Sequence, residues 1–335
     1  MAILGVLTVG TVVCSGNSTF ILYLIMILAA KEVNVRTIVK LTCIIQGAML
    51  LSIVVMSQIG IIPDYIFDAS TRQRHGLGFL WTTTGAILYF YFMVLYIYLR
   101  EERAHLIEYV ILEAVNFGLY KLTDARMSFY LSTLLLVYVY VMRFYWQNRK
   151  NRIRKNRLLI GAPAFFCILA VACQIFYIPT DARWQKINSV LSGRLELGCF
   201  GWRDYGFSLL GTKIEWIGFS HNATAGAYNY VDCSYMQILL ENGLIPLVII
   251  IAVYTYIMYM AVKEKDFYLQ TAVLLITAFS ITEPRLLNLA YNPLPFFGIT
   301  YISLRGRSAL FHREGHRLNR RVRFRTTHVR LKARK

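Results

Sequence analysis

The sequence predicts an all-α integral membrane protein with about ten transmembrane helices and one large extracytoplasmic loop. Composition is the first observation behind this prediction. Of the 335 residues, 57% are hydrophobic and only 16% are charged, whereas globular domains carry about 25% charged residues. Apolar runs recur along the chain, and the mean hydropathy is +0.48. This composition excludes a disordered chain, a coiled coil and a secreted disulfide scaffold.

The apolar segments are the second observation, because a helix needs about 20 apolar residues to cross a bilayer. The segments are 1–14, 17–30, 41–62, 79–99, 106–122, 127–143, 158–178, 243–262, 267–283 and 291–304. The first two are short and are either one interrupted span or a truncated start. We expect one membrane domain, 1–304, followed by a basic tail, 305–335.

The basic residues alternate between connections, and this alternation predicts the topology. The tail holds 12 Lys and Arg residues, and the stretch 143–157 holds 7 more. With the connections 31–40, 100–105 and 263–266, these regions hold 26 of the 36 basic residues. Basic loops stay in the cytoplasm, so we expect both termini inside and the loop 179–234 outside. The net charge of +18 then indicates anionic lipid as a partner and not nucleic acid.

The loop 179–234 is amphipathic. Apolar residues recur at helical spacing after Asp181, and we expect an interfacial helix anchored by Trp184. A second short helix begins near residue 232, with Asp232 or Ser234 as its N-cap. Cys199 and Cys233 also lie in this loop, and we favour two free thiols over a disulfide.

Several chemical motifs are absent from the sequence. It has no phosphate-binding GxxxxGK[ST] loop and no dinucleotide-binding glycine pattern. It has no GxSxG nucleophile motif and no His, Cys or acidic cluster with metal spacing. We therefore expect no cofactor and no metal. Any reaction would use a substrate that is activated before it arrives.

Charged residues in the predicted outer connections are the candidates for chemistry. Arg126 falls in the first turn of a helix that Thr123 or Asp124 would cap. A cation there opposes the helix dipole, unless an anion binds between the guanidinium and the free N–H groups. The alternative is a weak surface pair with Asp124. The residues alone leave these two interpretations open.

Two carboxylates stand out in the same connections. Glu283 ends an apolar run, and an ionised carboxylate at membrane depth costs about 2.5–3.5 kcal/mol or more. Such a group usually forms an ion pair or has a chemical function. Arg285 is the candidate ion-pair partner nearest to it in the sequence. Asp232, taken by itself, is more simply explained as a helix cap.

Five short segments together resemble one family, the bacterial polysaccharide repeat-unit polymerases (the O-antigen polymerase-like, or Wzy, family). The segment VDCSYMQILLENGLIP, around Asp232, resembles their Asp-x-Ser-Tyr segment. The other resemblances are Arg74-His-Gly-Leu-Gly-Phe79, Leu122-Thr-Asp-Ala-Arg126, Ser192-Gly-Arg194, and an acid and an amide at Glu283 and Asn292. The chain departs from the family at Leu80-Trp81-Thr82, where members often have Pro-Asn.

The resemblance implies a membrane glycosyltransferase of the bacterial inner membrane. It would transfer a growing glycan from one undecaprenyl pyrophosphate to a newly arrived lipid-linked unit, on the outer face. Arg74, Arg126 and Arg194 would hold the pyrophosphate, with Arg72 secondary. Asp232 would be the base, with Glu283 second. Tyr235 would stack on a sugar or lie against lipid headgroups. A flippase and a chain-length regulator are the implied protein partners.

Three other functions are compatible with this sequence. An O-antigen ligase-like transferase shares the donor and typically presents a His-Asn pair, for which His221-Asn222 is the candidate. A transporter of lipid-linked sugars would use the outer arginines only to bind an anion in transit, and it should place charges within its helices at mid-membrane. A non-catalytic subunit of a polysaccharide assembly complex is the third.

Overall fold

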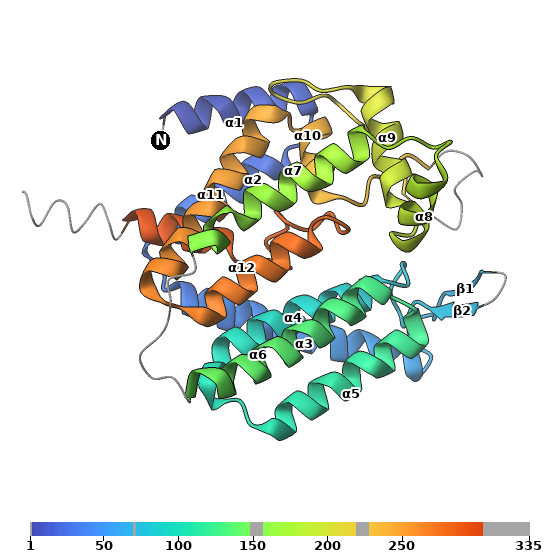
Figure 1. The fold of residues 1–335 in the computed structure, drawn as a ribbon, viewed down its shortest axis with the longest axis vertical. Coiled ribbons are helices and arrows are strands. Elements are labelled where there is room, and N and C mark those ends of the chain that lie inside the picture. The colour runs from blue at the N-terminus through green and yellow to red at the C-terminus, as the bar shows by residue number, and fades with distance from the viewer. Residues whose placement is uncertain (1, 70–71, 148–156, 219–227, 304–335) are drawn as a thin grey trace, which may run out of the picture.

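The computed structural model describes residues 2–69, 72–147, 157–218 and 228–303, and it is mostly helical (Figure 1). The elements of the first half are α1 (Ala2–Ser15), α2 (Thr19–Ala29), α3 (Val35–Gln58), β1 (Ile66–Ala69), β2 (Arg72–His75), α4 (Thr84–Arg100), α5 (Leu106–Thr123) and α6 (Arg126–Gln147). Those of the second half are α7 (Ala162–Ile175), α8 (Ala182–Val190), α9 (Arg194–Tyr205), α10 (Ser234–Glu241), α11 (Leu244–Glu264) and α12 (Phe267–Phe279). Short 3-10 helices cover Ala30–Glu32, Glu101–Arg103 and Arg157–Gly161, and a last helix covers 295–303.

The helices form two groups. In Figure 1, α3, α4, α5 and α6 lie below, while α1, α2, α7, α10 and α11 lie above. Helix α12 joins the groups, because it packs on α7 and α11 on one side and on α4 and α6 on the other. The β1–β2 hairpin, α8 and α9 all lie at one end of the helices, which we call the loop end (Figure 1).

Aromatic side chains fill the contact between the two groups. The rings of Phe90 on α4 and Phe279 on α12 are 4.3 Å apart. Tyr91 contacts Tyr291 in the segment after α12, with ring centroids 5.7 Å apart. Phe90, Tyr91 and Phe279 are fully buried. Large aromatic surfaces dominate the energetics of such contacts, so this cluster fixes how the two groups meet beneath the loop end.

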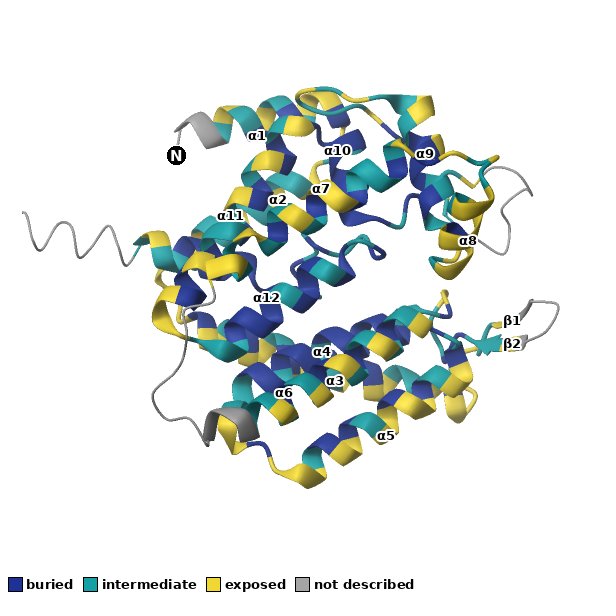
Figure 2. Cartoon of the chain, in the orientation of Figure 1, coloured by how far each residue is buried: buried dark blue, intermediate teal, exposed yellow. Residues whose placement is uncertain are grey.

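The apolar exterior of the helices indicates a membrane protein. Helices α3 (Val35–Gln58) and α11 (Leu244–Glu264), and the stretch Arg157–Ile175, are long and apolar enough to cross a bilayer. Large apolar side chains such as Leu51, Ile107 and Leu134 are exposed, and Figure 2 shows exposed positions recurring along helices such as α5. Soluble monomers rarely expose such continuous apolar surface.

Polar caps define the ends of several helices. Asn34 accepts from the backbone N–H of Arg36 at the start of α3, and Asp266 accepts from that of Leu269 at the start of α12. His105 and Glu108 form a capping box at the start of α5. These side chains satisfy backbone donors that a helix start leaves free.

Two expectations for the loop 179–234 are corrected by the structure. The predicted interfacial helix is broken at Ser192 and Gly193, which have φ of 56° and 85°, so α8 and α9 are separate. The ring of Trp184 lies 6.0 Å from that of Tyr177, and its role as an interfacial anchor stays a prediction. Neither Asp232 nor Ser234 caps α10, because the N-cap residue is Cys233 and no side chain bonds the helix start.

Other outcomes concern two cysteines, the connection before α4 and the segments that lie outside the described residues. Cys199 and Cys233 are buried free thiols, as the sequence favoured. The β1–β2 hairpin was not expected, and it pairs Phe67 with Arg74 and Ile66 with His75. The basic stretch 148–156, the segment 219–227 with His221-Asn222, and the tail 304–335 lie outside the described residues.

Candidate functional site

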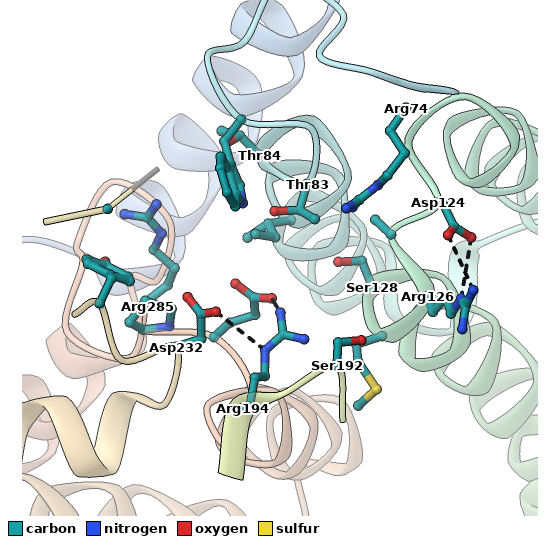
Figure 3. Close-up of a pocket in the computed structure, with 18 of the residues that line it drawn as sticks. Arg74, Thr83, Thr84, Asp124, Arg126, Ser128, Ser192, Arg194, Asp232 and Arg285 are labelled. Atoms are coloured by element: carbon teal, nitrogen blue, oxygen red, sulfur yellow. Dashed lines mark hydrogen bonds and ion pairs between the residues drawn. The ribbon is translucent and has the colours of Figure 1, made fainter. Parts of the chain in front are cut away.

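A cavity of about 440 Å³ is lined by residues of β2, of the starts of α6 and α9, and of the segments before α10 and after α12. Charged side chains from distant segments line it (Figure 3). They are Arg74, Arg126, Arg194, Arg285, Asp124, Asp232 and Glu283. Four cations thus face three carboxylates, and the cavity is suited to an anionic ligand.

Arg194 lies at the centre of this charge cluster. Its Nη2 donates to Glu283 Oε1 over 2.8 Å, and its Nε lies 4.0 Å from Asp232 Oδ2. Only 15% of its side chain is exposed. Arg194 Nε makes no hydrogen bond within the described part of the structure. A buried donor without a partner is a frequent sign of a functional site.

The local fold explains the position of Arg194. The left-handed conformation of Ser192 and Gly193 ends α8 and lets α9 begin at Arg194. Asn188 accepts from the backbone N–H groups of Leu195 and Glu196, and so satisfies the start of α9. Arg194 therefore occupies a helix N-terminus, where a cation opposes the dipole and a nearby anion relieves the cost.

Glu283 and Asp232 differ in their availability. The Glu283 side chain is 7% exposed, and burial raises its pKa to about 7 although the Arg194 guanidinium acts in the opposite direction. The Asp232 side chain is 26% exposed. Burial raises the pKa of Asp232 above its usual value, and Arg194 and Arg285 oppose that shift. Glu283 is occupied by its ion pair, whereas Asp232 is closer to the open cavity.

The ion-pair partner of Glu283 is Arg194 and not Arg285, which was the alternative that the sequence offered to a functional role. The guanidinium of Arg285 instead lies over the ring of Tyr291, 5.1 Å from its centroid. Cation–π contacts of this kind hold a guanidinium flat on an aromatic face. Arg285 thereby becomes a fourth cavity cation that the sequence interpretation missed. Its spacing two residues after Glu283 was the available signal.

A buried polar network holds the segment that carries Glu283 and Arg285. Tyr254 Oη donates to the Leu286 carbonyl over 2.8 Å. Asn292 Nδ2 donates to the same carbonyl and to Tyr254 Oη. Ser234 Oγ donates to the Glu283 carbonyl and accepts from the Leu286 N–H. All of these contacts except the one between Asn292 and Tyr254 satisfy a buried backbone group, and together they hold the segment after α12 in place beside the cavity.

Arg74 reaches the cavity from β2. Asp64 fixes the turn that follows the strand, since it contacts His75 Nδ1 over 2.6 Å and accepts from the Leu77 N–H over 2.7 Å. Arg74 Nε donates to the Thr123 carbonyl at the end of α5. Burial lowers the pKa of Arg74. A partly desolvated cation is poised to gain from an anionic partner.

Arg126 is the most accessible of the four arginines, with 49% of its side chain exposed. It begins α6, and the Thr123 hydroxyl oxygen accepts from the Ala125 N–H just before that helix. Thr123 is the last residue of α5, and Asp124 is its left-handed C-cap with φ of 51°. Arg126 lies 3.4 Å from Asp124 (Figure 3), and an exposed contact of this length is weak. A ligand can therefore recruit Arg126 at small cost.

Neutral side chains complete the lining. Hydroxyl groups come from Thr83, Thr84, Ser128 and Ser192, and aromatic rings come from Trp81, Tyr228 and Tyr230. Trp81 and Tyr228 are each 37% exposed. The cavity thus combines cations, hydrogen-bonding groups and aromatic faces, which are the groups that bind phosphates and sugars.

The cavity brings together five of the seven predicted site residues: Arg74, Arg126, Arg194, Asp232 and Glu283. Tyr235 is a correction, because it is fully buried and donates to the Thr277 carbonyl within the helices. It does not meet a sugar or lipid headgroups. Arg72 begins β2, and its side chain lies outside the described part. Among the described residues, no group of three or more His, Cys, Asp or Glu is placed to hold a metal ion.

Comparisons with known proteins give no relative for this chain. No family model matches it, and no curated protein or solved structure matches it either. The cavity geometry is therefore the basis for a functional assignment.

Proposed function

We propose that this protein is a membrane glycosyltransferase that polymerises oligosaccharide repeat units carried on undecaprenyl pyrophosphate. One observation carries the proposal. Arg74, Arg126 and Arg194 come from separate segments and line a single cavity beside Asp232. The resemblance of the same segments to repeat-unit polymerases supports it. The product would be a capsular, extracellular or O-antigen polysaccharide.

The arginines would bind the departing pyrophosphate. Guanidinium groups bind phosphate oxygens in a bidentate manner, and the four arginines of the cavity exceed its three acids by one positive charge. Positive charges that are already oriented before the reaction stabilise the negative charge that develops on the leaving group. The donor arrives activated, which agrees with a sequence that lacks nucleotide-binding motifs.

Asp232 would act as the general base. In the transfer, the acceptor hydroxyl oxygen forms a bond to the anomeric carbon of the donor, and the bond from that carbon to the pyrophosphate oxygen breaks. The electron pair leaves with the lipid pyrophosphate, and the hydroxyl proton passes to Asp232. Such a base must lie within hydrogen-bond reach of the hydroxyl. Asp232 fits better than Glu283, whose oxygen is held by Arg194 at 2.8 Å.

The proposal includes an orientation in the membrane. The loop end would face outward, and the ten apolar segments would place both termini in the cytoplasm of a bacterial inner membrane. The cavity then opens where flipped lipid-linked units arrive. The charges that line it lie on β2, at or just before the starts of helices and after the end of α12, and not at mid-helix positions, which favours a transferase over a transporter. A flippase and a chain-length regulator would be the partners.

Deletion in the native host, followed by gel analysis of the glycan, tests the proposal. Accumulation of single-unit lipid-linked oligosaccharide is expected. Long unattached chains would indicate a ligase, and loss of outward-facing intermediates would indicate a flippase. Wild-type protein and the Arg203→Lys variant should restore chain growth, since Arg203 is exposed on α9 and does not line the cavity. Asp232→Asn should not restore it.

A further inference from the structure

Arg285 differs in its contacts from the other three arginines that line the cavity. Arg126 and Arg194 are in ion pairs, and Arg74 donates to a backbone carbonyl. No carboxylate of the described residues pairs with Arg285. Its guanidinium lies over the ring of Tyr291, and its Nε is buried and makes no hydrogen bond to a described residue. This part of the chain therefore holds a positioned cation without an anionic partner.

Asp232 lies between Arg285 and the other arginines. Figure 3 shows Arg285 on the left of Asp232, whereas Arg74 and Arg126 lie on the right, beyond Arg194. The charges with the largest influence on Arg74 include those of Arg126 and Arg194. Arg285, in contrast, is among the charges that influence Asp232. The cavity thus has two sides, which we call the three-arginine side and the Arg285 side.

Aromatic side chains accompany the cation on the Arg285 side. Tyr228 and Tyr230 line the cavity, and the charges of Arg285 and Asp232 both act on Tyr230. Asn229 holds the segment between the two rings, because its Nδ2 donates to Tyr205 Oη over 2.8 Å. A sugar ring can pack against such aromatic faces. A sugar that also carries a negative group would supply the partner that the guanidinium lacks.

The direction of the proposed transfer assigns a substrate to each side. In a direct displacement, the nucleophile approaches the anomeric carbon from the face opposite to the leaving group. The base must lie at the acceptor hydroxyl. If the pyrophosphate occupies the three-arginine side, the acceptor glycan therefore approaches from the Arg285 side, with Asp232 between the two.

We propose that Arg285 binds the carboxylate of an acidic sugar, of the hexuronic acid class, at the non-reducing end of the acceptor glycan. This inference rests on the proposed function and adds the chemical class of the acceptor to it. A guanidinium and a carboxylate form two parallel charge-assisted hydrogen bonds. A neutral sugar offers only hydroxyl groups and leaves the cation unpaired, so Arg285 would select against it.

Binding of two model glycosides to the purified full-length protein tests the inference. Methyl β-glucuronide carries a carboxylate where methyl β-glucoside carries a hydroxymethyl group, and the two are otherwise identical. Saturation-transfer NMR should show that the glucuronide binds about tenfold more tightly. Arg285→Gln should make the two affinities equal, and Arg285→Lys should retain part of the preference. Arg126→Gln, on the three-arginine side, is the matched variant and should leave the ratio of the two affinities unchanged.

Two results would overturn the proposal. One is equal binding of the two glycosides to the wild-type protein, and the other is a preference for the glucuronide that survives in Arg285→Gln. Competition adds a test that needs no variant. Saturating inorganic pyrophosphate should leave the glucuronide bound, because it would occupy the three-arginine side. Displacement of the glucuronide would mean that Arg285 belongs to the diphosphate site, against the proposal.

This inference and the proposed function can fail separately, because glycoside binding needs no turnover. A preference for the glucuronide, in a protein whose deletion leaves the polymer unchanged, would keep the acidic-sugar site and reject the polymerase. Accumulation of single units on deletion, together with equal binding of the two glycosides, would keep the polymerase and reject the acidic acceptor.

Discussion

Arg194 Nη2 donates to Glu283 Oε1 over 2.8 Å and so joins the start of α9 to the turn after α12, 89 residues later. Both side chains are largely shielded from solvent, at 15% and 7% exposure. The contact ties the large loop to the segment that also carries Arg285. It therefore fixes the relative positions of two cavity cations and holds Glu283 away from other partners.

Removal of one partner of this pair should destabilise the protein strongly. Arg194→Gln leaves a buried carboxylate without its cation, which costs about 3–5 kcal/mol. The double variant Arg194→Gln/Glu283→Gln should recover much of that loss, because both charges are then absent. Thermal unfolding in detergent measures both effects. The exposed Arg126→Gln is the control, with an expected change of about 0.5 kcal/mol or less. Additive losses in the double variant would contradict a coupled pair.

The pH dependence of stability should depend on Glu283. Its pKa is raised from 4.5 to about 7 in the fold, so the native state binds the proton more tightly than the unfolded chain. Stability from this group is therefore full below pH 4.5 and is lost as the pH rises through about 7. Glu283→Gln should flatten the dependence in this window. A profile unchanged by that substitution would show that another group titrates.

The sequence predicted the helical class, Arg126 and Glu283 from local signals, whereas Arg74, Arg194 and Asp232 were predicted from the resemblance to repeat-unit polymerases. Apolar length marks helices, and charges at the ends of apolar runs are visible without a fold. The sequence did not predict the partner of Glu283, because Arg194 is 89 residues away and its position depends on the break at Ser192 and Gly193. Tyr235 was misplaced for the same reason, since burial against Thr277 is a tertiary effect.

For the rate of chain growth, the bidentate hydrogen-bonding geometry of the Arg126 guanidinium should matter more than its positive charge. Arg126→Lys keeps the cation but removes bidentate phosphate contact. Because the side chain is half exposed and its pair with Asp124 is weak, stability should stay unchanged. We expect the rate of chain growth to fall about tenfold, since one good charge-assisted contact is worth about 1.5 kcal/mol or more. The assay is polymer length and amount in deletion cells. Arg203→Lys is the matched control, and wild-type growth in Arg126→Lys would exclude the bidentate role.

Asp64 should act as a positioning residue for Arg74. Asp64→Ala removes the contact with His75 and leaves the Leu77 N–H without its acceptor. The turn after β2 should loosen, and Arg74 should leave its contact with the Thr123 carbonyl. The expected result is weaker binding of lipid pyrophosphate, seen as a raised KM with a smaller change in kcat. Asp64→Asn keeps an acceptor for Leu77 and should rescue part of the loss. Asp204→Ala, at an exposed position on α9, should have no effect.

The aromatic rings at the cavity should bind the glycan and not the pyrophosphate. Trp81 and Tyr228 line the cavity and are each 37% exposed, so a sugar ring can lie against them through its C–H face. Trp81→Ala should weaken use of a large acceptor glycan, while Trp81→Phe keeps an aromatic face and should retain most activity. Binding of the lipid pyrophosphate alone should stay unchanged in both variants, because the arginines are intact. Phe200→Ala, an exposed ring on α9 outside the cavity, serves as the control. Equal losses of glycan and pyrophosphate binding in Trp81→Ala would instead mean that Trp81 supports the fold of the cavity.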